Sequence, residues 1–354
     1  MTRCVFVRNR IINLIALVLM MCALSACGSE EAESYTDQGM DALEALDYGT
    51  AAALFDTALS SGEEARLAYR GKGMALLGLS RYSEAEQMFL KALGESNGRV
   101  NKIDYDISYY LAVAQAKSGR YDEAYDTYSA IIGMNEGDED AYYLRGKISL
   151  CRGDKGAALE DFDKSIVLAP TNYDNYIRIC KDLTNSGYES EGNAYIQRAM
   201  NTDYKKTDYQ MGVFHYYAGE YEEAKAYFEK NKGKKDTKDL ILYLGRTYEA
   251  LGDNNYAASL YSEYLASHPD ETELYMQLGQ NKMNQQDYEG ALSAFESGIV
   301  TNNVEYAQTL KFNRIVAYEY LLDFKKAAVL MKEYLDEYPD DEEAEREYRF
   351  LKTR

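Results

Sequence analysis

A ten-residue pattern recurs along the chain about every 34 residues, and this spacing constrains the fold more than any other feature. The pattern reads SRYSEAEQMF at residues 80–89, GRYDEAYDTY at 119–128 and GEYEEAKAYF at 219–228. Each copy combines a small or turn-prone residue, an aromatic residue, an acid, an alanine and a second large apolar residue. Such a recurrence predicts an array of similar structural units rather than a set of unrelated domains.

Three columns of residues define the period. The central position is held by Ala51, Ala85, Ala124, Ala158, Gly192, Ala224, Ala257, Ala291 and Ala327, at successive spacings of 34, 39, 34, 34, 32, 33, 34 and 36 residues. Four residues later come Phe55, Phe89, Tyr128, Phe162, Ile196, Phe228, Tyr261, Phe295 and Met331. Twelve residues earlier come Gly39, Gly73, Ala112, Gly146, Cys180, Gly212, Gly245, Gly279 and, as an exception, Ile315. All three prolines follow a central position by twelve residues, a phase that predicts a loop because proline disrupts helix interiors.

Each period predicts two helices. Apolar residues recur at steps of three and four in residues 142–150 and 240–250, which is typical of a helix with one buried face. A glycine follows near the expected turn, at Gly119, Gly153, Gly187, Gly219 and Gly252. A single pair of helices cannot bury both of its apolar faces, so the pairs must stack into a solenoid.

The pattern resembles the tetratricopeptide repeat, a family of 34-residue helix–turn–helix units with this arrangement of Gly, Tyr, Ala, Phe and Pro. The resemblance implies an all-α, right-handed superhelical solenoid of about nine repeats over residues 33–341, starting near residues 32, 66, 105, 139, 173, 205, 238, 272 and 308. Residues 342–354 are expected to form a charged helix that caps the last repeat. The fifth repeat departs from the family pattern, with Cys180, Gly192 and Ile196 at three key positions.

The N-terminus carries the features of a secretory signal. Three arginines within the first ten residues precede an apolar run at 11–24, which is shorter than the roughly 20 residues that cross a bilayer. The run ends in Leu24-Ser25-Ala26-Cys27, which resembles a bacterial lipobox. The resemblance implies removal of residues 1–26, lipid attachment to the Cys27 sulfur, and a tether at residues 27–32. An ordinary cleaved signal followed by a coincidental cysteine is the alternative.

Lipidation would place the protein outside the cytoplasm. The outer leaflet of the cytoplasmic membrane is the favoured location, and the periplasm or the outer membrane applies if the envelope is Gram-negative. Two or more acyl chains suffice for stable anchoring.

Charge and motif content exclude several classes of function. The formal net charge of −20 disfavours nucleic acid as a partner, because phosphate binding requires clustered Lys and Arg. The chain has two histidines and lacks the HExxH, P-loop, GxSxG and GxGxxG motifs. We therefore assign no catalytic, cofactor-binding or metal-binding residue and expect a protein that is not an enzyme. Cys151 and Cys180 could form a disulfide or remain as two buried thiols.

A partner is expected on the first helices, which line the concave surface of a helical solenoid. The helical face opposite the buried one carries aromatic and basic residues: Tyr143, Lys147, Arg178, Lys181, Tyr209, Tyr216 and Arg246. Rigid aromatic rings beside Lys and Arg suit an extended peptide with acidic or terminal carboxylate groups. The alternative is that the tyrosines fill space and the lysine stems cover apolar surface.

These features predict a non-enzymatic, membrane-anchored scaffold that holds an extended peptide outside the cytoplasmic membrane. A carbohydrate-binding or cell-envelope biogenesis accessory is one alternative, because the chain has 35 tyrosines, and its partner would be a cell-wall glycan. An outer-membrane or pilus assembly lipoprotein of a Gram-negative cell is another, compatible with Gly28 after Cys27.

Overall fold

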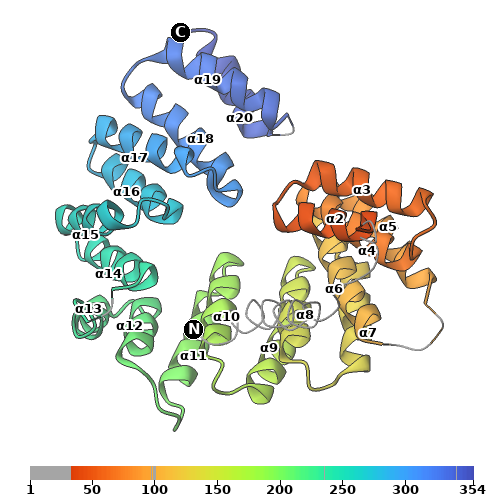
Figure 1. Cartoon of the computed structure of the whole chain (residues 1–354). Helices are drawn as coiled ribbons and strands as arrows, with labels where there is room; N and C mark the ends of the chain where they lie inside the picture. Colours follow the sequence, from red (N-terminus) through yellow and green to blue (C-terminus); the bar gives the residue numbers. More distant parts are fainter. Residues whose placement is uncertain (1–32, 97, 99–100, 235, 340) are drawn as a thin grey trace, which may run out of the picture. The chain divides into compact units, whose positions relative to one another are not determined.

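The computed structural model describes residues 33–354, except residues 97, 99, 100, 235 and 340. The described residues form α-helices and no strand, so the expected all-α class is confirmed (Figure 1). The predicted signal, Cys27 and the predicted tether lie outside the described residues.

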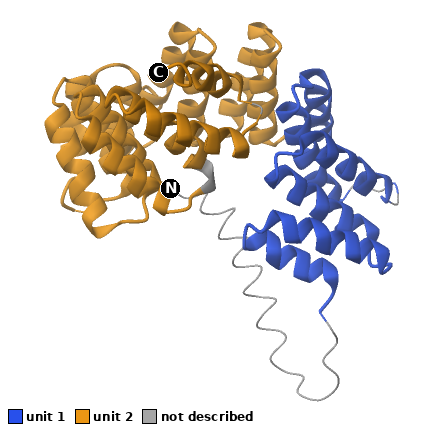
Figure 2. Ribbon diagram, turned by 90° about the horizontal axis from the view of Figure 1, so that it is seen from above, with its two compact units in different colours: residues 1–136 blue, residues 137–354 orange. Residues whose placement is uncertain are grey.

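The described helices follow one another as nine pairs and a final single helix, and we number the pairs as repeats one to nine. They are α2 (Tyr35–Glu44) with α3 (Tyr48–Ser60), α4 (Ala65–Gly78) with α5 (Tyr82–Gly94), α6 (Lys102–Lys117) with α7 (Tyr121–Met134), α8 (Glu139–Cys151) with α9 (Lys155–Leu168), α10 (Tyr173–Asn185) with α11 (Glu189–Met200), α12 (Asp208–Tyr217) with α13 (Tyr221–Glu229), α14 (Lys238–Ala250) with α15 (Asn254–Ser267), α16 (Thr272–Asn284) with α17 (Tyr288–Val300), and α18 (Val304–Tyr320) with α19 (Phe324–Glu337), followed by α20 (Glu342–Leu351). Helices α2–α7 belong to one compact unit and α8–α20 to a second, which begins at Gly137 (Figure 2).

Every pair turns through one residue with a left-handed backbone. Glycine holds this position in five turns, as at Gly119 with φ 74°, whereas Leu46, Ser80, Gln286 and Leu322 hold it in the other four. The next residue donates its N–H to a carbonyl five positions back, as Arg120 does to Gln115 at 2.9 Å. This bond is typical of the Schellman motif, which satisfies the free carbonyls at a helix end. The turn therefore ends the first helix and begins the second in the same place in every repeat.

The periodic columns form the core. All eight alanines at the central position have no exposed surface. The glycines of the small column lie against the large residue of the same repeat, so an added Cβ would lie 2.7 Å from the Phe162 ring at Gly146 and 2.2 Å from the Phe295 ring at Gly279. The two columns thereby set the distance between the helices of a pair, and each buried ring stabilises the fold by about 1.5–3 kcal/mol.

The fifth repeat compensates for its unusual residues. Cys180 and Ile196 are both buried, so a larger residue in the small column faces a smaller one in the large column. Gly192 replaces the central alanine, and a Cβ there would lie 2.9 Å from the Cys180 carbonyl oxygen. Both Cys180 and Cys151 are free thiols; Cys180 is buried as expected, whereas Cys151 is exposed.

Candidate functional site

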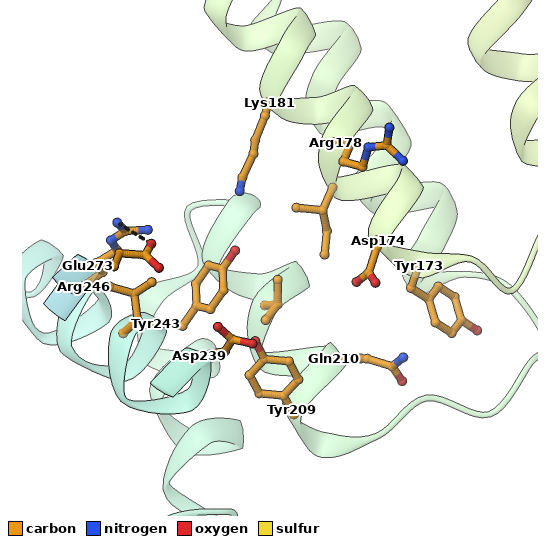
Figure 3. A pocket seen from close by; sticks show the side chains of 13 residues that line it. Tyr173, Asp174, Arg178, Lys181, Tyr209, Gln210, Asp239, Tyr243, Arg246 and Glu273 are labelled. Carbon is orange, nitrogen blue, oxygen red and sulfur yellow. Dashed lines mark ion pairs between the residues drawn. The ribbon is translucent and has the colours of Figure 1, made fainter. Parts of the chain in front are cut away.

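A pocket of about 310 Å³ opens on the first helices of repeats five to eight, within the second compact unit. It is lined by thirteen residues of α10, α12, α14 and α16 (Figure 3). We call it the charged pocket because six of these residues are ionic: Asp174, Arg178, Lys181, Asp239, Arg246 and Glu273.

Helical spacing brings these side chains to one surface. Asp174, Ile177 and Lys181 stand three and four residues apart on α10, as do Asp239, Leu242 and Arg246 on α14. Residues at these steps share one face of a helix. Because Lys181 and Arg246 each follow the small column by one residue, repeats five and seven place them in equivalent positions.

The floor of the pocket is apolar and aromatic. Val213 and Leu242 are buried beneath it, and the rings of Tyr209 and Tyr243 meet edge to face with centroids 6.4 Å apart. A charged ligand group above such a floor would be partly removed from water, which strengthens its interaction with a charge on the wall.

Tyr209 and Tyr243 lie near charges of opposite sign. Burial raises the pKa of Tyr209, and the carboxylates of Asp239 and Asp174 raise it further. Burial also raises the pKa of Tyr243, but Lys181 and Arg246 act against that rise. Negative charge is therefore concentrated around Tyr209, and positive charge around Tyr243.

Lys181 differs from the other cations that line the charged pocket. It extends from α10 toward Tyr243 (Figure 3) and makes no ion pair among the described residues; its ammonium lies 5.4 Å from the centre of the Tyr217 ring. Lys181 is thus the lining cation whose charge is open to a ligand.

The other two lining cations already have partners. The guanidinium of Arg178 lies 3.8 Å from the centre of the Tyr143 ring and 3.2 Å from the Asp140 carboxylate. The Arg246 Nε donates to the Gln277 side-chain oxygen at 3.0 Å, and its guanidinium lies 3.9 Å from Glu273. A ligand would have to compete with these groups for either arginine.

The seven predicted groove residues do not share one site. Arg178, Lys181, Tyr209 and Arg246 line the charged pocket, whereas Tyr143, Lys147 and Tyr216 do not. Tyr143 is buried rather than open, because Arg178 covers its ring and its hydroxyl donates to Asp182.

The remaining two residues contact other side chains of the protein. The Lys147 ammonium lies 3.2 Å from the Asp182 carboxylate. The Tyr216 ring packs on Tyr217 and Tyr243, with centroids 5.4 and 5.5 Å away. Neither residue lines the charged pocket, although Tyr216 packs on a tyrosine that does.

The sequence-based prediction missed the acidic half of the pocket. Asp174 and Asp239 stand seven residues before Lys181 and Arg246, and Glu273 stands seven before Gln280, so each lies two helical turns away on the same face. This shared phase was the signal that could have identified them.

A second pocket, of about 430 Å³, lies on α16, α17 and α18. We call it the amide pocket, because its lining holds no charged side chain but several carboxamides: Gln280, Met283, Asn284, Gln286, Tyr288, Phe295, Asn313, Val316 and Tyr320. The rings of Tyr288 and Tyr320 are stacked, with centroids 4.9 Å apart. Tyr320 is 56% exposed, so part of this pair faces solvent.

The described residues contain no group of three or more His, Cys, Asp or Glu side chains that could hold a metal ion. None of their helices combines the length and apolar character that spanning a membrane requires.

Comparison with known families agrees with the repeat geometry. One model of the tetratricopeptide repeat matches residues 36–100 and 242–303, and a second model of the same repeat matches residues 76–148. This chain contains tetratricopeptide repeats. The matched tetratricopeptide repeats include parts of both compact units and the α14 and α16 walls of the charged pocket.

Individual relatives are distant. FK506-binding protein 59 of Drosophila melanogaster is 28% identical over 145 residues, which cover 38% of this chain and 33% of that protein. The chain therefore aligns with about one third of the length of this relative. A tetratricopeptide repeat protein from Parabacteroides merdae has a TM-score of 0.46 at 15% identity, over 72% of this chain and 98% of its own. MamA from Desulfovibrio magneticus has a TM-score of 0.42 at 17% identity, over 49% of this chain and 96% of its own.

Proposed function

We propose that this protein is a non-enzymatic scaffold that holds a protein partner by an extended peptide segment in the charged pocket. The observation that carries the proposal is Lys181, a cation that forms no ion pair with the described residues and lies above a floor of tyrosine and buried aliphatic side chains. A carboxylate placed against it would form a charge-assisted hydrogen bond, roughly twice as strong as a neutral one. The matched tetratricopeptide repeats, which include part of α14 and all of α16, support the proposal because stacked helix pairs can hold such a surface.

Covalent cross-linking tests the location. A photoreactive amino acid at Ile177, which lines the pocket, should capture the partner in cells, whereas one at the exposed Glu263 of α15 should not. The captured protein should no longer be recovered when Lys181→Glu is introduced into the Ile177 variant. Equal capture from both positions, or capture unaffected by Lys181→Glu, would contradict the proposal.

We also propose that the protein acts outside the cytoplasmic membrane, held there by lipids on Cys27. The support is the order of basic residues, apolar run and lipobox in residues 1–27. Labelled palmitate should be incorporated by the natural chain and not by Cys27→Ala, and Cys27→Ala should leave the membrane fraction. A Cys27→Ala protein that stays with the membrane would overturn the anchor.

A second candidate function, carbohydrate binding, is favoured by the amide pocket. Carboxamides donate and accept hydrogen bonds with hydroxyl groups, and the exposed part of the Tyr288–Tyr320 pair offers an aromatic surface to the apolar face of a sugar. On a glycan array, Tyr320→Ala should remove binding and Lys181→Glu should not. The same array distinguishes the two functions, because a peptide scaffold would bind no glycan at all.

A further inference from the structure

The charged pocket has two ends of opposite sign. Asp174 and Lys181 both project from α10, seven residues apart, which corresponds to about 10 Å along a helix. Asp239 and Arg246 repeat this arrangement on α14. Figure 3 shows Lys181 extended toward Tyr243, and Asp174 on the side of Tyr209 and Asp239.

Each end presents a charge that the described residues leave uncompensated. Lys181 has no ion pair, as described above, and the side chain of Asp174 has neither an ion pair nor a hydrogen bond within the described part of the chain. The Asp239 carboxylate has a single distant ion pair, with Lys238 at 3.9 Å. Glu273, by contrast, is engaged by Lys238 at 2.8 Å and lies beside Arg246. Among the described residues the open charges are therefore Lys181, toward Tyr243, and Asp174, toward Tyr209, and Asp239 adds a weakly paired acid at the Tyr209 end.

A wholly acidic ligand fits this pocket poorly. Its carboxylates would approach Lys181 at one end but would meet Asp174 and Asp239 at the other, and like charges placed together across an interface oppose binding. A wholly basic ligand meets the reverse problem at Lys181 and Arg246. The pocket therefore discriminates by the arrangement of charge and not only by its sign.

We propose that the charged pocket selects a dipolar peptide segment, with a carboxylate at the Lys181 end and an ammonium or guanidinium group at the Asp174 end. An extended peptide in the polyproline II conformation rises about 3.1 Å per residue with three residues per turn, so opposite charges three residues apart lie on the same side and span about 9 Å, close to the 10 Å between the two ends. The floor of Ile177, Val213 and Leu242 suits apolar side chains between them. This inference rests on the proposed function and narrows its ligand from acidic peptides to segments of mixed charge.

Four end-capped peptides that differ only in their charges test the inference. Between glycine–serine flanks the peptides would contain Lys-Val-Leu-Glu, the charge-exchanged Glu-Val-Leu-Lys, the acidic Glu-Val-Leu-Glu or the basic Lys-Val-Leu-Lys. Binding of each to the full chain would be measured by calorimetry. We expect at least one of the two dipolar peptides to bind about tenfold more tightly than either uniform peptide, because it replaces one repulsive contact of the uniform peptide with an attractive one.

Charge reversal at each end should change the preference in a specified way. Asp174→Lys sets an ammonium group beside Asp239 and should reduce the preference of the dipolar peptides over the acidic peptide. Lys181→Glu sets a carboxylate beside Arg246 and should reduce their preference over the basic peptide. The matched controls are Asp336→Lys and Lys332→Glu, which make the same changes of charge at exposed positions of α19. Circular dichroism would verify that all four variants keep their helices.

The outcomes separate the inference from the function on which it rests. Equal binding of all four peptides, or preference of the natural chain for the acidic peptide, would overturn the dipolar inference and leave peptide binding in place. Failure of every peptide to bind the natural chain and both pocket variants would overturn the charged pocket as a peptide site, and with it both proposals.

Discussion

The charged pocket and the amide pocket are built from the same part of the repeat, yet they offer opposite chemistry. The residue that follows the small column is Lys181 in repeat five and Arg246 in repeat seven, but Gln280 in repeat eight and Val316 in repeat nine. All four line a pocket. The helix places this residue at the pocket, and its side chain decides whether the pocket wall is charged or neutral there. The residue before it belongs to the small column of the core. In these four repeats a core residue and a pocket residue are thus neighbours in the sequence, whereas the same position in repeat six, Val213, is itself buried.

The strongest test of this comparison removes the frame that both pockets share. An added Cβ would lie 2.2 Å from the Tyr261 ring at Gly245 and 2.2 Å from the Phe295 ring at Gly279. We expect Gly245→Val and Gly279→Val each to lower the free energy of unfolding by about 3 kcal/mol, because a packed core does not admit extra volume.

Urea denaturation would measure both losses. The control is Gly133→Ala in α7, where an added Cβ meets nothing within 4 Å, and a better helix former should raise the free energy of unfolding by about 0.5–1 kcal/mol. If Gly245→Val and Gly279→Val were as mild as the control, the small column would not be the frame of either pocket.

A smaller effect concerns Glu319 of α18, which precedes Tyr320 of the amide pocket in the sequence. The pKa of Glu319 is raised from 4.5 to about 7, chiefly because the group is partly buried. The negative charge of Glu347 and a hydrogen bond with it raise the pKa further. The folded state therefore binds this proton more tightly than the unfolded state, and the free energy of unfolding falls as pH rises from 4.5 to 7. Because Glu319 is only partly buried, Glu319→Gln should raise the free energy of unfolding by about 1 kcal/mol at pH 8 and by nothing at pH 4.

Thermal unfolding across that pH range would check the expectation. Glu289→Gln, at an exposed position of α17, is the matched control and should show no such pH dependence. A gain for Glu319→Gln that is equal at pH 4 and pH 8 would exclude the titration as its cause.

The smallest effects are expected at two turns, one that follows α14 of the charged pocket and one that follows α16 of the amide pocket. Gly252 in repeat seven has φ 86°, whereas Gln286, which lines the amide pocket, has φ 61°. Gly252→Ala should lower the free energy of unfolding by about 1 kcal/mol, because only glycine adopts this backbone without strain. Gln286→Gly should stabilise by at most about 0.5 kcal/mol, since the relief of strain is offset by the greater freedom of glycine in the unfolded chain. Chemical denaturation curves would measure both, and a loss of stability in Gln286→Gly would show that its side chain stabilises the turn.

Much of the fold could be predicted because it depends on local spacing. The central alanines, the small column and the turn glycines recur with one period, and each has the same role in every repeat where it occurs. The fifth repeat shows why departures from the pattern were harder to interpret. Cys180, Gly192 and Ile196 look irregular one at a time, but their volumes compensate one another once the helices are packed.

The site was less predictable, because exposure depends on the neighbouring repeat. Tyr143 has the helical phase of a groove residue, yet two residues of the next first helix engage it: Arg178 covers its ring, and Asp182 accepts a hydrogen bond from its hydroxyl. Basic residues attract notice in a chain with a net charge of −20, whereas acids at the same phase do not. Asp174 and Asp239 were therefore overlooked, although they share the helical face of Lys181 and Arg246.

Residue spacing alone predicted that the chain forms helix pairs, where five of the nine pairs turn, and which columns are buried. Helical periodicity and turn chemistry act over a few residues, so the sequence contains them directly. Which charges are neutralised and which remain open was decided only by the tertiary structure. Tyr143 meets Asp182 across 39 residues and Lys238 meets Glu273 across 35, and such pairings exist only after the repeats have stacked. Lys181 and Asp174 stay open because stacking brings no opposite charge to them, and that absence among the described residues gives the charged pocket its two ends.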